Sequence, residues 1–247
     1  MTKDTFGIIV VGDEILNGRR QDRHFEALGG MLRERGFSVA WLRILPDDPD
    51  YLTTELGRTM FEDRPVFCCG GIGATPDDHT RACAARAAGV ALEMHPGAVD
   101  DIEARFGADA YPHRIRMAEL PCGSELIPNP YNRVPGFSIQ RHYFMPGFPD
   151  MAHPMAAWVL DNYYGAGGLR EAQRALQVFG VPESGLMDLM ERLTAQFPHA
   201  KLFSLPRLGK EYQIEVGFRG KGDLDAPFNA LITGLKELGI RYEVLGD

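Results

Sequence analysis

The chain has 247 residues, 45% of them hydrophobic, and a formal net charge of −8. This length predicts one large domain and one small one, with enough apolar side chains for buried cores. The negative charge argues against a nucleic-acid partner, because phosphate backbones need clustered lysine and arginine. No apolar run approaches the ~20 residues that span a bilayer, and the N-terminus lacks a signal-peptide pattern, so we expect no membrane contact and a cytoplasmic protein.

Lysine is absent between residues 4 and 200. That stretch therefore has no P-loop lysine and no Schiff-base lysine. Positive charge there must come from arginine, from backbone dipoles or from a bound metal. The four cysteines are a poor disulfide framework for a chain of this length. Cys68 and Cys69 are adjacent in an expected strand, where alternation points them to opposite faces, so they are unsuited to share a metal.

The first part of the chain alternates strand and helix patterns. Continuous apolar runs predict strands at 6–11, 37–45 and 66–69, and each is followed by a helical spacing of apolar residues. This order predicts right-handed crossovers and a parallel sheet. A helix near 96–106, three short strands in the proline-rich stretch 125–145 and a helix at 151–159 complete a first domain over 1–164.

Residues 66–80 read as an apolar strand that runs into a loop with three glycines, Gly70, Gly71 and Gly73. Glycine has no Cβ, so such a loop lets backbone N–H groups approach a phosphate. Asp77 and Asp78 follow directly. Their carboxylates suit a phosphate site if a divalent cation lies between, or if they accept hydrogen bonds from the ligand. Alternatively, they only complement a helix dipole.

Acidic pairs follow all three of the first strands: Asp13 with Glu14, Asp47 with Asp48, and Asp77 with Asp78. In a parallel sheet these turns lie at one edge, which is the usual ligand crevice. A single pair is weak evidence, because acids are common in turns. Three pairs beside a glycine loop predict a metal-assisted phosphate site.

A glycine-rich segment, 165–169, predicts a linker to a second domain at 170–247. The pattern after it is strand, helix, strand, strand, helix, strand. This order is typical of the small α+β, ferredoxin-like arrangement.

The segment Gly70-Gly71-Ile72-Gly73-Ala74-Thr75-Pro76-Asp77-Asp78-His79-Thr80 resembles the T-G-G-x-G-x-T-x-x-D-x-T motif of the molybdopterin-binding domain family, which has the MoaB/MogA-like fold. The closer similarity is to the N-terminal part of CinA-type competence/damage-inducible proteins. Further support comes from three segments, 12–18 with Asp22, 128–136 and 146–151, so the resemblance spans residue 7 to about 160. The second domain resembles the middle domain of longer CinA proteins.

The resemblance implies a three-layer α/β/α domain with a mostly parallel sheet and a ligand pocket at the strand ends. It implies Asp78 and Asp47 as catalytic residues. The expected metal ligands are Asp13, Asp47 and Asp78, holding Mg²⁺ or another divalent cation. The expected contacts to a small phosphorylated ligand, with molybdopterin as one candidate, are Gly70, Gly71, Gly73, Thr75, Thr80, Asp13, Asp22, Pro135, Gly136, Pro146 and Gly147. A homo-oligomer is also implied.

The sequence departs from the family pattern at several positions. Cys68 and Cys69 replace threonines, Arg23-His24 replaces Thr-Asn after Asp22, and Asn132 replaces a usual glycine. The chain length leaves no room for the amidohydrolase domain of longer CinA proteins, so that activity is not predicted.

Three functions compete. The first is a metal-dependent pyrophosphatase of the ADP-ribose or FAD type, or a nucleotidyl transferase similar to the molybdopterin adenylyltransferases. The second is a protein that binds molybdopterin or a nucleotide without turnover. A dinucleotide-dependent oxidoreductase is disfavoured, because the loop lacks G-x-G-x-x-G spacing and follows the third strand instead of the first.

Overall fold

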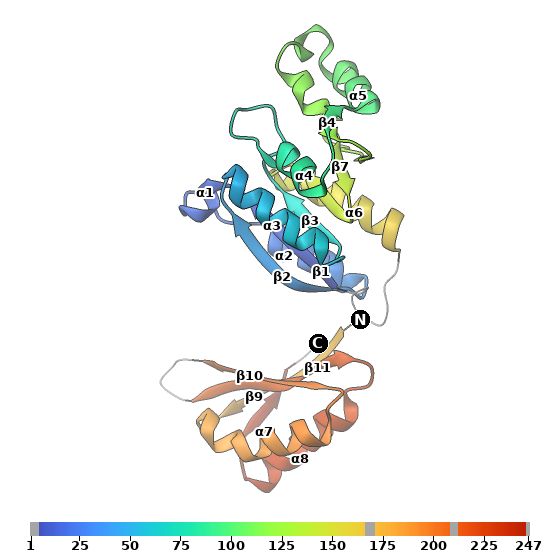
Figure 1. The fold of residues 1–247 in the computed structure, drawn as a ribbon. Helices are drawn as coiled ribbons and strands as arrows, with labels where there is room; N and C mark the ends of the chain where they lie inside the picture. The colour runs from blue at the N-terminus through green and yellow to red at the C-terminus, as the bar shows by residue number, and fades with distance from the viewer. Residues whose placement is uncertain (1–4, 166–170, 208–211, 246–247) are drawn as a thin grey trace. The chain divides into compact units, whose positions relative to one another are not determined.

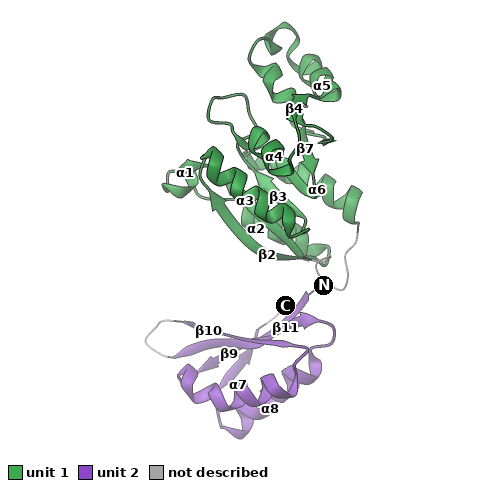
Figure 2. Cartoon of the chain, viewed as in Figure 1, with its two compact units in different colours: residues 1–168 green, residues 169–247 purple. Residues whose placement is uncertain are grey.

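The computed structural model describes residues 5–165, 171–207 and 212–245. The chain divides into two compact units, residues 1–168 and 169–247 (Figure 2). Most of the linker expected at 165–169 lies outside the described residues. The two units are taken in turn.

A six-stranded sheet forms the centre of the first unit. Its strands, in spatial order, are β2 (Ser38–Leu45), β1 (Thr5–Val11), β3 (Val66–Cys69), β8 (His142–Met145), β7 (Gly136–Ile139) and β6 (Glu125–Ile127). The first four run parallel, and β7 and β6 are antiparallel to their neighbours. The order places β1 and β3 side by side, so the turns that follow them lie together at the carboxyl edge.

Helices cover both faces of this sheet (Figure 1). They are α1 (Asp13–Leu16), α2 (His24–Glu34), α3 (Pro49–Phe61), α4 (Thr80–Ala88) and α6 (Pro149–Val159), whereas α5 (Pro96–Phe106) lies away from the sheet (Figure 1). One core joins Ile9 of β1 to Leu56 of α3 and Cys83 of α4, and the other joins Ile8 to Leu28 of α2 and Met155 of α6. This arrangement confirms the expected three-layer α/β/α fold. It follows from the alternation of β1, whose successive side chains enter opposite cores.

The segment between α4 and β6 contains elements that the sequence does not predict. It contains α5, the 3₁₀ turns η1 (Gly107–Ala110) and η2 (Arg114–Ala118), and a two-stranded antiparallel sheet of β4 (Leu92–Met94) with β5 (Glu119–Pro121), between which these three elements lie in the chain. Each strand has three residues, which is too short for a period-2 pattern to stand out. A π-helical turn, η3 (Leu160–Tyr164), follows α6.

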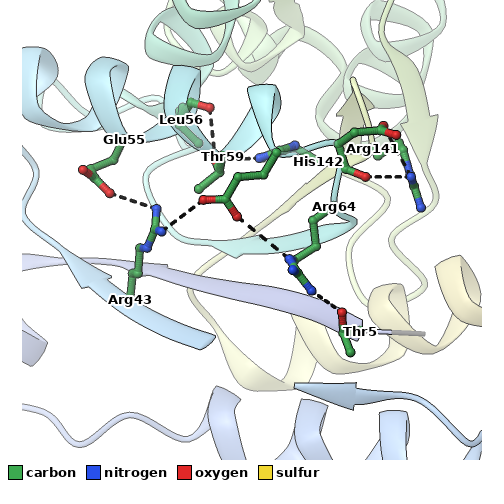
Figure 3. Close-up of polar contacts among 10 residues, drawn as sticks. Thr5, Arg43, Glu55, Leu56, Thr59, Arg64, Arg141 and His142 are labelled. Atoms are coloured by element: carbon green, nitrogen blue, oxygen red, sulfur yellow. Dashed lines mark hydrogen bonds and ion pairs between the residues drawn. The ribbon is translucent and has the colours of Figure 1, made fainter. Parts of the chain in front are cut away.

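A polar network joins α3 to neighbouring strands of the sheet (Figure 3). Arg43 of β2 pairs with Glu55 at 3.0 Å and with Glu62 at 3.5 Å. Buried Thr59 contacts Nε2 of His142 at 2.8 Å, at the first residue of β8. These bonds fix α3 over the sheet by satisfying polar groups that packing would otherwise strip of water.

The second unit contains β9 (Glu171–Phe179), η4 (Glu183–Leu186), α7 (Met187–Gln196), β10 (Lys201–Arg207), β11 (Gln213–Lys221), α8 (Asp225–Glu237) and β12 (Tyr242–Val244). Its sheet has the order β10-β11-β9-β12, and every pairing is antiparallel. Leu193 of α7 and Phe228 of α8 pack on Val216 of β11. This confirms the ferredoxin-like order of elements. Among the described residues, no helix is both long enough and apolar enough to cross a membrane.

Candidate functional site

A cavity of about 480 Å³ lies at the carboxyl edge of the parallel strands in the first unit, and we call it the edge cavity. Its size is in the range of small-molecule sites. Many of the predicted site residues line it: Asp47, Gly70, Gly71, Gly73, Thr75, Asp78, Pro146 and Gly147. The glycine loop, the turn after β2 and the loop after β8 therefore meet at one place.

Other predicted residues lie near the edge cavity without lining it. The backbone N–H of Asp13 donates to Oδ2 of Asp47, which lines the cavity. The carboxylate of Asp22 accepts the backbone N–H groups of His24 at 2.9 Å and Phe25 at 3.0 Å, where α2 begins. Pro135 and Gly136 are buried at the start of β7. A Cβ on Gly136 would lie 2.3 Å from a backbone oxygen of β8, so this glycine permits close strand packing.

Two positions of the glycine loop have a positive φ and no room for a Cβ, Gly70 and Gly71. Gly70 has φ of 113°, and an added Cβ would lie 2.2 Å from the backbone oxygen of Val11. Gly71 has φ of 67°, and its Cβ would lie 2.2 Å from Oγ1 of Thr80. The Thr80 hydroxyl is buried and donates to the Gly70 oxygen at 3.0 Å. The hydroxyl of Thr80, which the sequence predicts to contact a ligand, therefore stabilises the glycine loop from its buried side.

Asp78 fixes the tip of the same loop. Its Oδ2 accepts both the backbone N–H of Thr75, at 2.9 Å, and the Thr75 hydroxyl. A Cβ on Gly73 would lie 2.5 Å from that oxygen, so the close turn needs glycine. These bonds commit one carboxylate oxygen to the loop, and Oδ1 is the oxygen left for a ligand or cation.

The expected convergence of the acidic turns is confirmed around Asp47. Its Oδ2 accepts the backbone N–H of Asp13 at 2.9 Å. Burial raises the pKa of Asp47, and the nearby charges of Asp13, Glu14 and Asp77 raise it further, against the lowering effect of that hydrogen bond. Asp48 has another role: its Oδ1 accepts the N–H of a first-turn residue and caps α3.

The acidic side chains are oxygen donors of the type that Mg²⁺ prefers. Within the ranges that the structure describes, no three His, Cys, Asp or Glu side chains are grouped so as to hold a metal ion. Mg²⁺ often binds through only one or two carboxylates, with water and phosphate oxygens completing its shell. A site of this kind would need from the protein only Asp47 and one neighbouring carboxylate. The assignment of Asp13, Asp47 and Asp78 as metal ligands stays a prediction.

Two arginines that the sequence did not single out also line the edge cavity, Arg20 and Arg114. The guanidinium of Arg114 lies 4.7 Å over the ring of Phe106 and donates to the backbone oxygen of Asp109 at 2.8 Å. The absence of lysine from residues 4 to 200 was the one available signal, because it left arginine to supply side-chain positive charge.

The side chains of Cys68 and Cys69 face the two cores of the first unit and do not line the edge cavity. Burial raises the pKa of both thiols, so both are protonated. The replacement of the family threonines at these positions therefore changes core packing and leaves the cavity wall unaltered.

Comparisons with known proteins agree with this geometry. Residues 7–164 match the family described as "Probable molybdopterin binding domain". A CinA-like protein of Citrifermentans bemidjiense is 31% identical over 229 residues, which cover 90% of this chain and 54% of that protein. A protein of Aeropyrum pernix is 31% identical over 211 residues, covering 81% of this chain and 78% of its own length.

Among solved structures, the protein CinA of unknown function from Thermoplasma acidophilum matches with a TM-score of 0.60 and 27% identity. The match covers 66% of this chain and 99% of that one. The present chain spans about half the length of the CinA-like relatives it matches. The family match covers most of the chain and contains the whole glycine loop. The chain belongs to the molybdopterin-binding domain family and is similar to CinA-like proteins.

Proposed function

We propose that the edge cavity binds a nucleotide or pterin ligand by its phosphate or diphosphate group. With Mg²⁺ or another divalent cation, it would then hydrolyse a phosphoanhydride or transfer a nucleotidyl group. One observation carries the proposal: acids from the turns after β1, β2 and β3 meet beside a loop in which glycine is required. Backbone N–H groups in such a loop can approach phosphate oxygens that side chains would keep away.

The cavity lining carries side chains of both charges. Arg20 can pair with phosphate oxygens, whereas Asp47 would repel a bare phosphate. A divalent cation removes this conflict, since it polarises the phosphoryl group and neutralises charge that develops on it. The protein donors proposed for it are one or two of the carboxylates of Asp13, Asp47 and Asp78, the last through Oδ1, with phosphate and water oxygens completing its shell.

Hydrolysis would form a bond from water oxygen to one phosphorus, while the bridging oxygen leaves with the electrons of the broken P–O bond. A base must take the proton of that water. Asp47 is the candidate where the cation is held by the other carboxylates, because it lines the cavity and because burial and the neighbouring carboxylates raise its pKa.

The test is turnover of ADP-ribose, FAD, or molybdopterin with ATP, each with Mg²⁺, Mn²⁺ or Co²⁺, followed by chromatography of the products. We expect Asp47→Asn to lower turnover about 100-fold. Asp48→Asn is the matched control, because asparagine caps a helix as well as aspartate does and Asp48 does not line the cavity. If no substrate is converted with any of the three cations, the catalytic proposal fails.

Binding without turnover is the second candidate. It is favoured by the bonds from Thr75 that commit one oxygen of Asp78 to the loop. Calorimetric binding of a nucleotide diphosphate together with no product from the same sample would support it. Loss of turnover in Asp78→Asn, with ligand affinity unchanged, would contradict it.

A further inference from the structure

The side-chain amide of Asn132 lies in the wall of the edge cavity, beside Met151. Its Oδ1 accepts two hydrogen bonds, from the backbone N–H of Val134 at 3.0 Å and from Nδ2 of Asn129 at 2.8 Å. Both bonds lie within the turn that precedes β7. The oxygen of Asn132 is therefore used by the protein itself.

These bonds settle which way the amide points. A backbone N–H can only donate, so the atom of Asn132 that meets Val134 must be the oxygen. Asn129 is oriented in the same way, because its Oδ1 accepts the backbone N–H of Tyr131 at 3.0 Å and its Nδ2 donates to the backbone oxygen of Val134 at 3.0 Å. The backbone thus fixes both amides.

Nδ2 of Asn132 takes no part in the two bonds of the turn, and the residue itself lines the cavity. Nδ2 lies 3.6 Å from Sδ of Met151, which also lines the cavity. A thioether sulfur is a weak acceptor, and an amide nitrogen carries two N–H groups. Asn132 therefore presents a hydrogen-bond donor of fixed direction to a bound molecule.

The neighbouring side chains of the wall are apolar or donating. Phe106, Met117 and Val134 are apolar, and Arg114 is held over the Phe106 ring. A flat heterocycle fits such a surface by stacking. None of these side chains offers an oxygen to accept a hydrogen bond from the ring.

We propose that Asn132 is a specificity-determining residue, which donates from Nδ2 to an exocyclic carbonyl oxygen of the ligand's ring. The inference rests on the proposed function, because it places the phosphates of the same ligand at the glycine loop. Rings with a carbonyl group, such as pterins, flavins and hypoxanthine, are then favoured over adenine, so among the substrates proposed above molybdopterin and FAD, bound through its flavin, rank before ADP-ribose. An amino group in that position would face a donor and lose its own partner, which is a strong basis for rejection.

Inosine diphosphate and adenosine diphosphate test this directly, because they differ only at position 6 of the ring and in the proton on N1. Calorimetry on the full chain, with Mg²⁺, should show inosine diphosphate binding about 10-fold more tightly than adenosine diphosphate. Inorganic diphosphate serves as the ring-free probe.

Two variants of Asn132 distinguish loss of the Nδ2 donor from disruption of the turn that precedes β7. Asn132→Ala should bring the inosine-to-adenosine affinity ratio close to one and leave inorganic diphosphate within about twofold. Asn132→Asp keeps an oxygen for the Val134 N–H but replaces the donor by an acceptor, so the ratio should reach one or reverse. Asn129→Ala is the control: it removes one bond of the turn, while Val134 still orients the amide, so the ratio should persist.

The outcomes are distinguishable. If wild-type protein binds inorganic diphosphate but does not prefer inosine diphosphate, the inference about Asn132 is overturned and the proposed function stands. The same holds if the preference survives in Asn132→Ala. If neither nucleotide nor inorganic diphosphate binds, the proposed function fails and the inference fails with it.

Discussion

Arg81 of α4 donates from Nη2 to the backbone oxygen of Gly73 at 2.9 Å, so a buried guanidinium holds the glycine loop. Its Nη1 donates to the backbone oxygens of Glu119, at 3.0 Å, and of Arg116. The segment that contains these acceptors also carries Arg114 on the cavity wall. One side chain thus joins two walls of the edge cavity.

Replacing Arg81 by methionine should destabilise the first unit. Hydrogen bonds from a charged donor each contribute about 1.5–3 kcal/mol, and the variant loses several, so we expect the free energy of unfolding to fall by about 3 kcal/mol. Urea unfolding followed by tryptophan fluorescence measures this, because Trp41 and Trp158 both belong to the first unit. Arg58→Met, at an exposed arginine of α3 that lies 3.9 Å from Glu55 in an i,i+3 pair, should change it by less than about 0.5 kcal/mol. Equal effects of the two variants would contradict the role of Arg81.

Thr80 tests whether a predicted ligand contact is a structural one. Thr80→Val leaves the Gly70 oxygen without its hydroxyl donor and should lower the free energy of unfolding by about 1–2 kcal/mol. Thr80→Ser keeps the hydroxyl and should recover most of this loss in the same urea titration. If valine instead weakens diphosphate binding with no change in stability, the hydroxyl acts on the ligand.

Arg20 should supply side-chain charge for the phosphate. Arg20→Gln should weaken binding of inorganic diphosphate about 10-fold at low ionic strength, and by less at high salt, because salt screens an exposed pair. Arg19→Gln is the control, since Arg19 precedes it in the chain but does not line the cavity. Similar losses in both variants would show a general charge effect in place of a specific contact.

His142 should make the first unit less stable in acid. Burial lowers its pKa from 6.5 to about 4. In the neutral ring, Nδ1–H donates to the backbone oxygen of Gln140 at 3.0 Å. Nε2 lies 2.8 Å from the hydroxyl of Thr59, whose single proton is shared between Nε2 and the backbone oxygen of Leu56 (Figure 3). Between pH 4 and 6.5 the unfolded chain binds more protons than the folded one. Stability is therefore complete above pH 6.5 and falls as the pH drops toward 4.

The loss should reach roughly 3 kcal/mol, since each pKa unit corresponds to about 1.4 kcal/mol. Urea unfolding between pH 4 and 7 measures it. His142→Gln should reduce the slope, and part of it should remain, because burial also lowers the pKa of His24 and of His153. His113→Gln, at an exposed histidine, should leave the slope unchanged. An unchanged slope in His142→Gln would assign the acid sensitivity to other groups.

Much of the fold could be predicted because its signals are local. Strand alternation already indicated that Cys68 and Cys69 face opposite sides, and the two cores of the first unit confirm it. The convergence of the acidic turns also followed from topology, since parallel strands bring their carboxyl ends to one edge. The antiparallel pair of β4 and β5 was not predicted, because strands of three residues are too short to show a period-2 pattern.

The sequence by itself determined the three-layer domain, the ferredoxin-like unit and the meeting of acids with a glycine loop, because these depend on short-range pattern and strand order. Only the tertiary structure decided which side chains line the edge cavity. It directed Asp47 into the edge cavity and Asp48 to a helix cap, and it brought Arg114 and Asn132 to the wall from distant segments. Neighbours in sequence share a pattern, but the direction and partners of each side chain are set by packing against parts of the chain far away from it.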